Sequence, residues 1–265
     1  MEAPWLKALL AGLLTWGFTA LGAGLVLLLP RPNQRFLDGM LGLAGGAMLA
    51  ASFFGLLQPA MESAQEAWGR LSWIPVALGF IGGALLVVLL DQYAVRLRLF
   101  QPLARSLQEG NPRLALFLVL AIAMHNLPEG LGLGVTFGAA ALGLSEAITL
   151  GGALALALAI GLHNVPEGMA VAFPLRREGA SPWTAWFYGQ LSAVVEPLGA
   201  LLGALLVEAV APTLPYLLAV AAGVMVFVVV EEVIPSAQGN GNRRSVTWLA
   251  LGGFLLIMAL DATLG

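Results

Sequence analysis

The chain contains long windows without a single charged residue, and these windows constrain its fold more than any other feature. Residues 8–30, 39–61 and 71–90 carry no charge. A helix needs about 20 apolar residues to cross the hydrocarbon core of a bilayer. Because 59% of all residues are hydrophobic and only 10% are charged, we predict an integral membrane protein built from helices.

Further apolar segments follow along the chain, which gives eight predicted transmembrane helices and no attached soluble domain. They cover approximately residues 5–30, 39–63, 71–93, 114–137, 142–173, 182–208, 212–235 and 246–263. The fifth segment is longer than one crossing requires, so we expect a tilt or a kink there. Residues 1–265 are therefore expected to form a single all-α transmembrane domain.

Basic residues are divided unequally between the connections of these segments. Ten of the twelve lysines and arginines fall in odd-numbered connections, and only Lys7 and Arg70 lie on the other side. The ten are Arg31, Arg35, Arg96, Arg98, Arg105, Arg113, Arg176, Arg177, Arg243 and Arg244. Because cytoplasmic connections are enriched in basic residues, we place both termini outside, in a multi-pass protein of the plasma membrane. The basic residues form no groove that would indicate nucleic acid binding.

A six-residue phrase occurs twice within the apolar segments. It reads HNLPEG at residues 125–130 and HNVPEG at residues 163–168, and it contains both histidines of the chain. At ~100° per residue, the His, Asn and Glu side chains project within one third of the helix circumference. Ionisable residues inside a membrane are costly and are functional candidates by default. The duplication therefore predicts one intramembrane metal site built from two matching halves.

Imidazole and carboxylate ligands suit divalent zinc and its first-row neighbours. Because consecutive spans run in opposite directions, the two phrases should face each other, and His125, Glu129, His163 and Glu167 would supply four ligands. Each proline frees the carbonyl four residues earlier, a device found in the broken helices of transporter ion sites. The alternative is that these buried polar side chains simply satisfy one another.

With paired HNxPEG phrases on spans four and five, the chain resembles the ZIP family of divalent metal transporters, in particular its prokaryotic GufA-like branch. The resemblance implies a binuclear centre between spans four, five and six, in which Glu129 and Glu167 bridge the metals. The first metal would bind His125, Glu129, His163 and Glu167. The second would bind Asn126, Glu129, Asn164, Glu167 and Glu196. Glu196 lies in a phrase similar to the family's span six, SAVVEP at residues 192–197; alternatively it is a buried, protonated acid.

Two residues of span two, Met48 and Glu62, also match family positions. The family pattern places them along the metal's route. By the charge-derived topology Glu62 is an entrance residue and Met48 lies deeper, where it could equally be a core side chain.

Four further residues are candidates for the route. Gln190 and Ser192 either support the centre or line the pathway. Glu231 and Glu232, near the cytoplasmic end of span seven, would receive the departing metal or form a solvated pair.

The predicted function is inward transport of divalent transition-metal cations, chiefly zinc, across the lipid bilayer. Ligand types rank metals poorly, so Cd²⁺, Fe²⁺, Mn²⁺ and Co²⁺ remain candidate cargo. Two alternatives stay open: an intramembrane zinc metalloenzyme, and a transporter of another solute with a structural metal. A zinc protease expects HExxH, whereas Asn follows each His here, so no enzyme is predicted. The family also suggests a homodimer, and we expect a 3+2+3 arrangement with spans one to three and six to eight as inverted halves.

Overall fold

The computed structural model describes residues 3–29, 32–96, 112–177, 179–209 and 211–265, and within these ranges it contains helices and no strands. The α-helices are α1 (Pro4–Leu28), α2 (Gln34–Ala50), α3 (Gln58–Trp68), α4 (Trp73–Arg96), α6 (Pro112–Leu142), α7 (Leu150–Arg177), α8 (Pro182–Leu191), α9 (Val195–Ala209), α10 (Leu214–Val228), α11 (Ile234–Gln238) and α12 (Arg243–Leu264). The predicted all-α class is confirmed.

Seven segments in the described part of the chain are long and apolar enough to cross a membrane. They are Pro4–Leu28, Gln34–Gln65, Gly69–Leu90, Leu150–Arg177, Pro182–Val207, Ala211–Gln238 and Arg243–Leu264. Helix α6, which carries the first HNxPEG phrase, has 31 residues but is not among the seven. The multi-pass membrane class is confirmed, while the count of eight spans remains a prediction.

Two spans contain a π-helical turn that ends two residues before a proline. In span two, α2 continues through η1 (Ala51–Leu57) into α3, and Pro59 follows the turn. In span seven, α10 continues through η4 (Val229–Val233) into α11, and Pro235 follows in the same way. Because proline has no N–H to donate to the carbonyl four residues earlier, the hydrogen-bond ladder is disturbed at this place in both helices.

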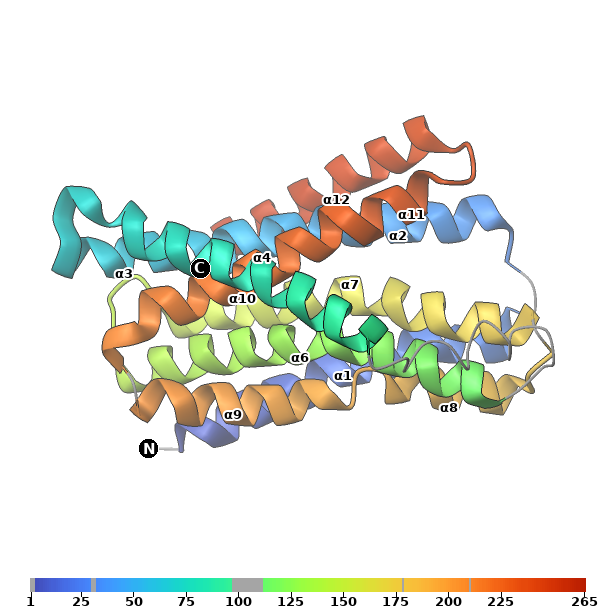
Figure 1. Ribbon diagram of the computed structural model, residues 1–265, viewed down its shortest axis with the longest axis horizontal. Coiled ribbons are helices and arrows are strands. Elements are labelled where there is room, and N and C mark those ends of the chain that lie inside the picture. The colour runs from blue at the N-terminus through green and yellow to red at the C-terminus, as the bar shows by residue number, and fades with distance from the viewer. Residues whose placement is uncertain (1–2, 30–31, 97–111, 178, 210) are drawn as a thin grey trace.

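The helices pack in two layers. In Figure 1, α2, α11 and α12 lie above α1, α6, α7, α8 and α9, while α4 and α10 run obliquely across the view. In the first layer α1, α6, α7, α8 and α9 pack against one another. In the second layer α2 pairs with α12 and α4 pairs with α10. The layers meet where α7 contacts α2 and α12, and where α6 contacts α10. The two HNxPEG helices therefore belong to the same layer.

Glycines bring helix backbones into contact within each layer. A Cβ added at several of them would collide with a backbone oxygen of a helix in the same layer. Such pairs are Gly46 with Ala250, Gly83 with Val220, Gly134 with Ala200, and Gly168 with Thr19. Between layers the neighbours are mostly side chains, as where Leu156 Cδ1 lies 2.7 Å from a Cβ built at Gly55. The exception is Gly151, which lies against the backbone of Leu264 at one end.

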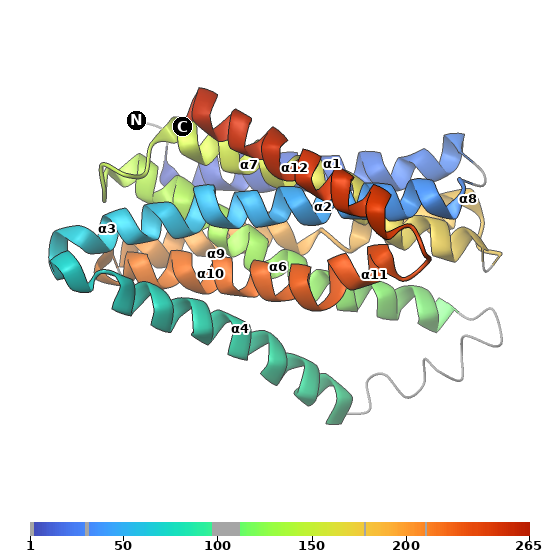
Figure 2. The ribbon, with the colours of Figure 1, turned by 90° about the horizontal axis from the view of Figure 1, so that it is seen from above.

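Successive spans run in opposite directions along the bundle, and the start of α1 and the end of α12 lie towards the same end (Figures 1 and 2). The turns at 69–72 and 143–149 lie at the end of the termini, and those at 179–181 and 239–242 lie at the other. Arg31, Arg98 and Arg105 lie outside the described residues, as do the side chains of Arg96 and Arg113. Described arginines of the predicted cytoplasmic group, such as Arg177 and Arg243, occupy the end opposite Lys7 and Arg70.

At this second end, a hydrogen-bonded cluster joins the two layers. Arg177 Nη1 on α7 donates to Gln34 Oε1 on α2 at 2.6 Å, and Gln34 Nε2 donates to Asp38 Oδ1 at 2.7 Å. Asp38, which is buried, also accepts hydrogen bonds from Asn240 Nδ2 and Asn242 Nδ2. The start of α2, the end of α7 and the connection before α12 are thereby held together.

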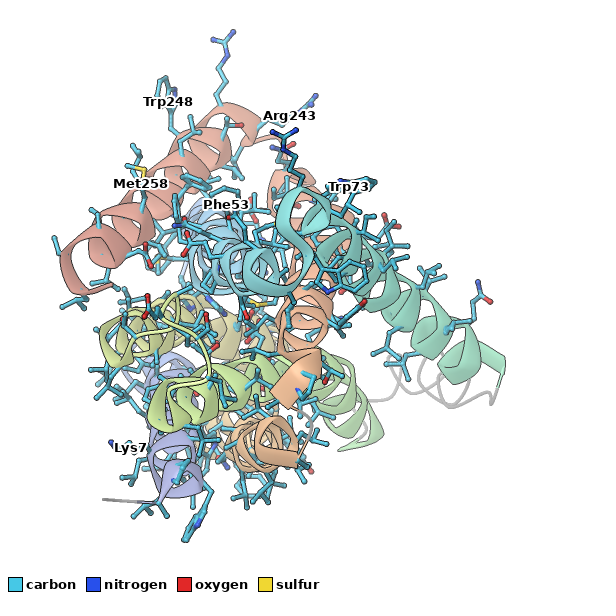
Figure 3. The ribbon with its side chains drawn as sticks, turned by 90° about the vertical axis from the view of Figure 1, so that its left-hand side faces the viewer. Lys7, Phe53, Trp73, Arg243, Trp248 and Met258 are labelled. Atoms are coloured by element: carbon cyan, nitrogen blue, oxygen red, sulfur yellow. The ribbon has the colours of Figure 1, made fainter. Side chains whose placement is uncertain are left out.

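Large apolar side chains cover the outside of the bundle. Trp73 on α4 and Trp248 on α12 are 57% and 74% exposed, and Trp248 and Met258 project outward in the end-on view of Figure 3. A surface of this kind is expected where lipid replaces water as the solvent.

Candidate metal centre

The two HNxPEG phrases lie in the middle of long helices of the first layer. Residues 125–130 belong to α6 and residues 163–168 belong to α7. Both helices continue through their proline, Pro128 or Pro166. Because neither proline has an N–H, the carbonyls of Met124 and Leu162 lack their usual helical donor, as the sequence analysis anticipated.

Three of the predicted ligands lie together in the interior. Glu129, His163 and Glu167 each offer one ligand atom, and these atoms lie within 4.8 Å of one another. His163 Nε2 is 3.4 Å from Glu129 Oε2, with side-chain exposures of 0% and 1%. Helix α6 contributes one carboxylate, while α7 contributes the imidazole and the second carboxylate. An imidazole between two carboxylates is a donor set suited to zinc and other divalent first-row metals.

Buried atoms without hydrogen-bond partners concentrate at these same residues. Eight buried side-chain nitrogen and oxygen atoms in the described part of the chain have no hydrogen-bond partner, and six of them belong to predicted ligands; two of the six, His163 Nε2 and Glu129 Oε2, face each other at 3.4 Å. The six are Asn126 Oδ1, Glu129 Oε2, His163 Nδ1, His163 Nε2, Asn164 Oδ1 and Glu167 Oε2. Leaving a buried polar group unsatisfied costs roughly 1–3 kcal/mol. A bound cation would satisfy several of these atoms at once.

The two asparagines are anchored through their amide nitrogens. Asn126 Nδ2 donates to the Ser192 carbonyl at 3.3 Å. Asn164 Nδ2 donates to both carboxylate oxygens of Glu196, at 2.8 and 2.9 Å, and to the Thr15 carbonyl at 3.2 Å. In each case the nitrogen is held by the surrounding scaffold while the oxygen has no partner. Both amide oxygens are therefore left free to bind a cation.

A break in span six supplies two of these anchors. The predicted span at 182–208 is two helices, α8 and α9, separated by a turn at residues 192–194. Ser192 closes the end of α8 by donating its hydroxyl to the Gly189 carbonyl at 2.7 Å. Glu196 occupies the first turn of α9, where the helix dipole favours a carboxylate. Ser192 and Glu196 are both completely buried.

His125, the fourth ligand predicted for the first metal, is directed towards the other layer. Its Nε2 lies 3.4 Å from Glu232 Oε1, and the two side chains are 18% and 43% exposed. Glu232 belongs to the π-helical turn η4, and Glu231 beside it is exposed. The structure thus joins the first phrase to one of the two carboxylates predicted for metal release.

The remaining route candidates occupy different environments. Met48 is fully buried in α2. Glu62 is exposed on α3 and accepts a hydrogen bond from Gln58 Nε2 at 3.0 Å. Gln190 is held by α1, because Trp16 Nε1 donates to its carbonyl at 2.9 Å and to its side-chain oxygen at 3.1 Å.

Helix α1 was not predicted to take part in the centre. Its Thr15 and Trp16 nevertheless contact Asn164 and Gln190. The sequence holds one signal for this role, since Thr15 and Thr19 are polar residues four positions apart in an apolar span and so share a helix face.

Comparison with known proteins identifies the family to which the chain is similar. Residues 104–261 match the family model described as ZIP Zinc transporter. Zinc transporter ZIP11 of Xenopus tropicalis is 38% identical, over 99% of this chain and 98% of that protein. Zinc transporter GufA of Myxococcus xanthus is 36% identical, over 97% and 98%. Zinc transporter ZIPB of Bordetella bronchiseptica is 39% identical, over 97% and 81%. The family resemblance inferred from the HNxPEG phrases is confirmed.

Proposed function

The chain belongs to the ZIP zinc transporter family, and on this basis we propose that it carries zinc towards the cytoplasm through the centre formed by α6, α7 and α9. Relatives that match it along nearly their whole length are named zinc transporters, so membrane transport of zinc is its activity. One observation supports the placement of the route: six ligand atoms of the duplicated phrase are buried without hydrogen-bond partners.

The proposed centre holds two metals. His125, Glu129, His163 and Glu167 bind the first, and Asn126, Glu129, Asn164, Glu167 and Glu196 bind the second. The cluster of Glu129, His163 and Glu167 supports the shared part of both sites. The free Oδ1 atoms of Asn126 and Asn164 support the second site, because their anchored nitrogens leave only oxygen to face a cation.

The proposed route begins near Glu62 and ends near Glu232. Glu62 lines a cavity of about 270 Å³ together with Glu146 and Asp261, so three carboxyl groups border the entrance. Met48 would follow deeper in the same span, with Gln190 and Ser192 beside the centre. At the other side, Glu232 contacts His125 directly and could accept a metal that leaves this ligand. Glu231, exposed next to it, would be the following step.

We further propose eight spans, with α6 included, in one transmembrane domain of residues 1–265 in the plasma membrane. The odd connections face the cytoplasm and both termini lie outside. The separation of Arg177 and Arg243 from Lys7 and Arg70 at opposite ends of the bundle supports this orientation.

The 3+2+3 arrangement with inverted halves also remains a proposal. Its support is local: spans two and seven, which correspond in such a repeat, both contain a π-helical turn followed by a proline. Inverted repeats are a recurring design of secondary transporters. A homodimer would use an exposed apolar face such as that of α12. Cd²⁺, Fe²⁺, Mn²⁺ and Co²⁺ are proposed as additional cargo.

Zinc uptake into proteoliposomes with a trapped zinc dye tests the proposal. We expect saturable uptake by the wild type and its loss, to the level of protein-free vesicles, in Glu167→Ala at matched protein density. Glu167→Gln keeps the volume of the side chain and removes only the charge, so it should fail nearly as badly. If wild type and Glu167→Ala transport zinc equally, the proposed centre is wrong. If the wild type binds zinc stoichiometrically but transports none, the metal is structural.

A further inference from the structure

Helix α1 packs against the three helices that form the proposed centre, α6, α7 and α9, and contributes none of the predicted ligands. Asn164 on α7 and Glu196 on α9 are linked by two hydrogen bonds, and the same Asn164 nitrogen reaches the Thr15 carbonyl on α1. Thr15, Asn164 and Glu196 each have 0% exposed surface. Three helices therefore meet at one completely buried polar cluster.

These contacts fix which way the Asn164 amide points. The Thr15 carbonyl and the carboxylate oxygens of Glu196 are acceptors, so the atom of Asn164 that faces them must be the NH₂ group. A reversed amide would bring oxygen against oxygen at the Thr15 carbonyl, which can only accept. The carbonyl oxygen Oδ1 is consequently turned away from α1 and has no partner.

The Thr15 hydroxyl has two possible acceptors. It donates to the Gly12 carbonyl of its own helix at 3.1 Å, and it lies close enough to the Glu196 carboxyl group to donate there instead. A hydroxyl carries one proton, so it can donate to only one of the two at a time. Glu196 thus has a second possible donor, on α1, in addition to Asn164.

The position of Thr15 is held from both sides by close backbone packing. A Cβ added at Gly12 would lie 2.7 Å from Pro197 Cα on α9. Two turns beyond Thr15 on α1, a Cβ added at Gly22 would collide with the backbone of Val165 on α7. Because α1 touches both neighbours at backbone distance, Thr15 cannot move away from Asn164 and Glu196 without separating the helices.

We infer that Thr15 is a positioning residue of the metal centre, which orients Asn164 and Glu196 so that the free amide oxygen of Asn164 and the carboxylate of Glu196 face the second metal. This inference rests on the proposed function, since it concerns ligands of the proposed second site. Thr15 itself binds no metal.

The test compares two isosteric substitutions on the same helix. Thr15→Val removes the hydroxyl and keeps the volume, leaving Asn164 as the remaining side-chain donor to Glu196 that the structure describes. Thr19→Val is the control: Thr19 is equally buried, four residues away on the same face, but its hydroxyl has no hydrogen-bond partner. Zinc uptake and the number of zinc ions bound per chain are measured for both.

For Thr15→Val we expect a roughly tenfold higher KM for zinc and one bound zinc ion in place of two at intermediate zinc concentration, with the maximal rate changed less than about twofold. Thr15→Ser, which retains the hydroxyl, should return KM to within about twofold of wild type. Thr19→Val should leave KM and the bound zinc unchanged. If Thr15→Val does not fold, Thr15→Ala removes the same hydroxyl without added bulk.

A wild-type KM in Thr15→Val, or an equal rise of KM in Thr19→Val, would overturn the inference. Failure of Thr15→Ser to restore KM would overturn it as well, because side-chain packing would then explain the loss. These outcomes are distinguishable from failure of the proposed function, which appears as wild-type uptake in Glu167→Ala. If Glu167→Ala abolishes uptake but Thr15→Val does not alter KM, the inference about Thr15 is wrong while the proposed function stands.

Discussion

The two HNxPEG phrases differ in one residue of sequence but occupy different surroundings. In the first phrase, His125 is partly exposed and contacts Glu232 in the other layer, and Asn126 is anchored to a single backbone carbonyl. In the second, His163 is fully buried beside Glu129 of the same layer, and Asn164 has three acceptors on two helices.

This difference suggests a division of roles between two chemically equivalent motifs. The second phrase is surrounded by its own layer, so its ligands are fixed and suited to holding a metal. The histidine of the first phrase contacts Glu232 in the other layer, so it is suited to passing the metal to that carboxylate. A duplicated motif thus supplies equivalent ligands, while the neighbouring helices decide what each copy does.

The largest expected difference concerns the two histidines. His163→Ala should reduce zinc uptake by about a hundredfold or more, because the buried cluster loses its only imidazole. His125→Ala should cost only about tenfold, because this side chain lies apart from the cluster. Uptake at matched protein density measures both variants. Equal losses would remove the proposed distinction between the phrases.

A smaller effect is expected at the anchor of the second phrase. Glu196→Gln replaces one acceptor oxygen by an NH₂ group that faces the NH₂ group of Asn164, so the pair must rearrange. We expect zinc affinity to fall by roughly tenfold, measured by equilibrium zinc binding.

Ser192→Ala is the matched change for the first phrase. It should have little effect, because Asn126 binds the backbone of Ser192. Comparable losses in both would show that the anchors are equivalent.

The smallest effect concerns release. Glu232→Gln keeps the size of the side chain but removes the charge that faces His125. We expect zinc binding to remain within about twofold of wild type while release into zinc-free buffer slows severalfold, followed by stopped-flow fluorescence of preloaded protein. Glu231→Gln, without a contact to His125, should slow release less. If Glu232→Gln accelerates release, Glu232 does not act as an acceptor for the metal.

The elements of the fold that depend on local sequence could be predicted, whereas those that depend on helix arrangement could not. Apolar windows and the HNxPEG phrases are local signals, so the membrane helices and the family followed from them. The contact of Thr15 with Asn164 joins residues 149 positions apart, and no local pattern encodes it. The same is true of the pair His125 and Glu232.

The exact residue at which a helix begins was also not predictable from apolar composition. The fifth span was expected to begin at residue 142, but α7 begins at Leu150. Gly143 has a positive φ of 62°, and the Thr149 hydroxyl accepts a hydrogen bond from the Gly152 N–H, so residues 143–149 form a turn and a helix start. This turn contains apolar residues such as Leu144 and Ile148, so its composition alone cannot be distinguished from that of a transmembrane helix.

The distribution of glycines has a consequence for how the molecule tolerates change. Within each layer a methyl group at Gly46 or Gly134 would meet backbone atoms, which cannot rotate out of the way. Between layers, at Gly55, the nearest atoms belong to the flexible side chain of Leu156. Substitutions within a layer should prevent the helices from packing. Substitutions between the layers should leave the protein folded and change the rate of transport. We therefore expect sequence changes to be tolerated better at the plane between the layers than within either layer.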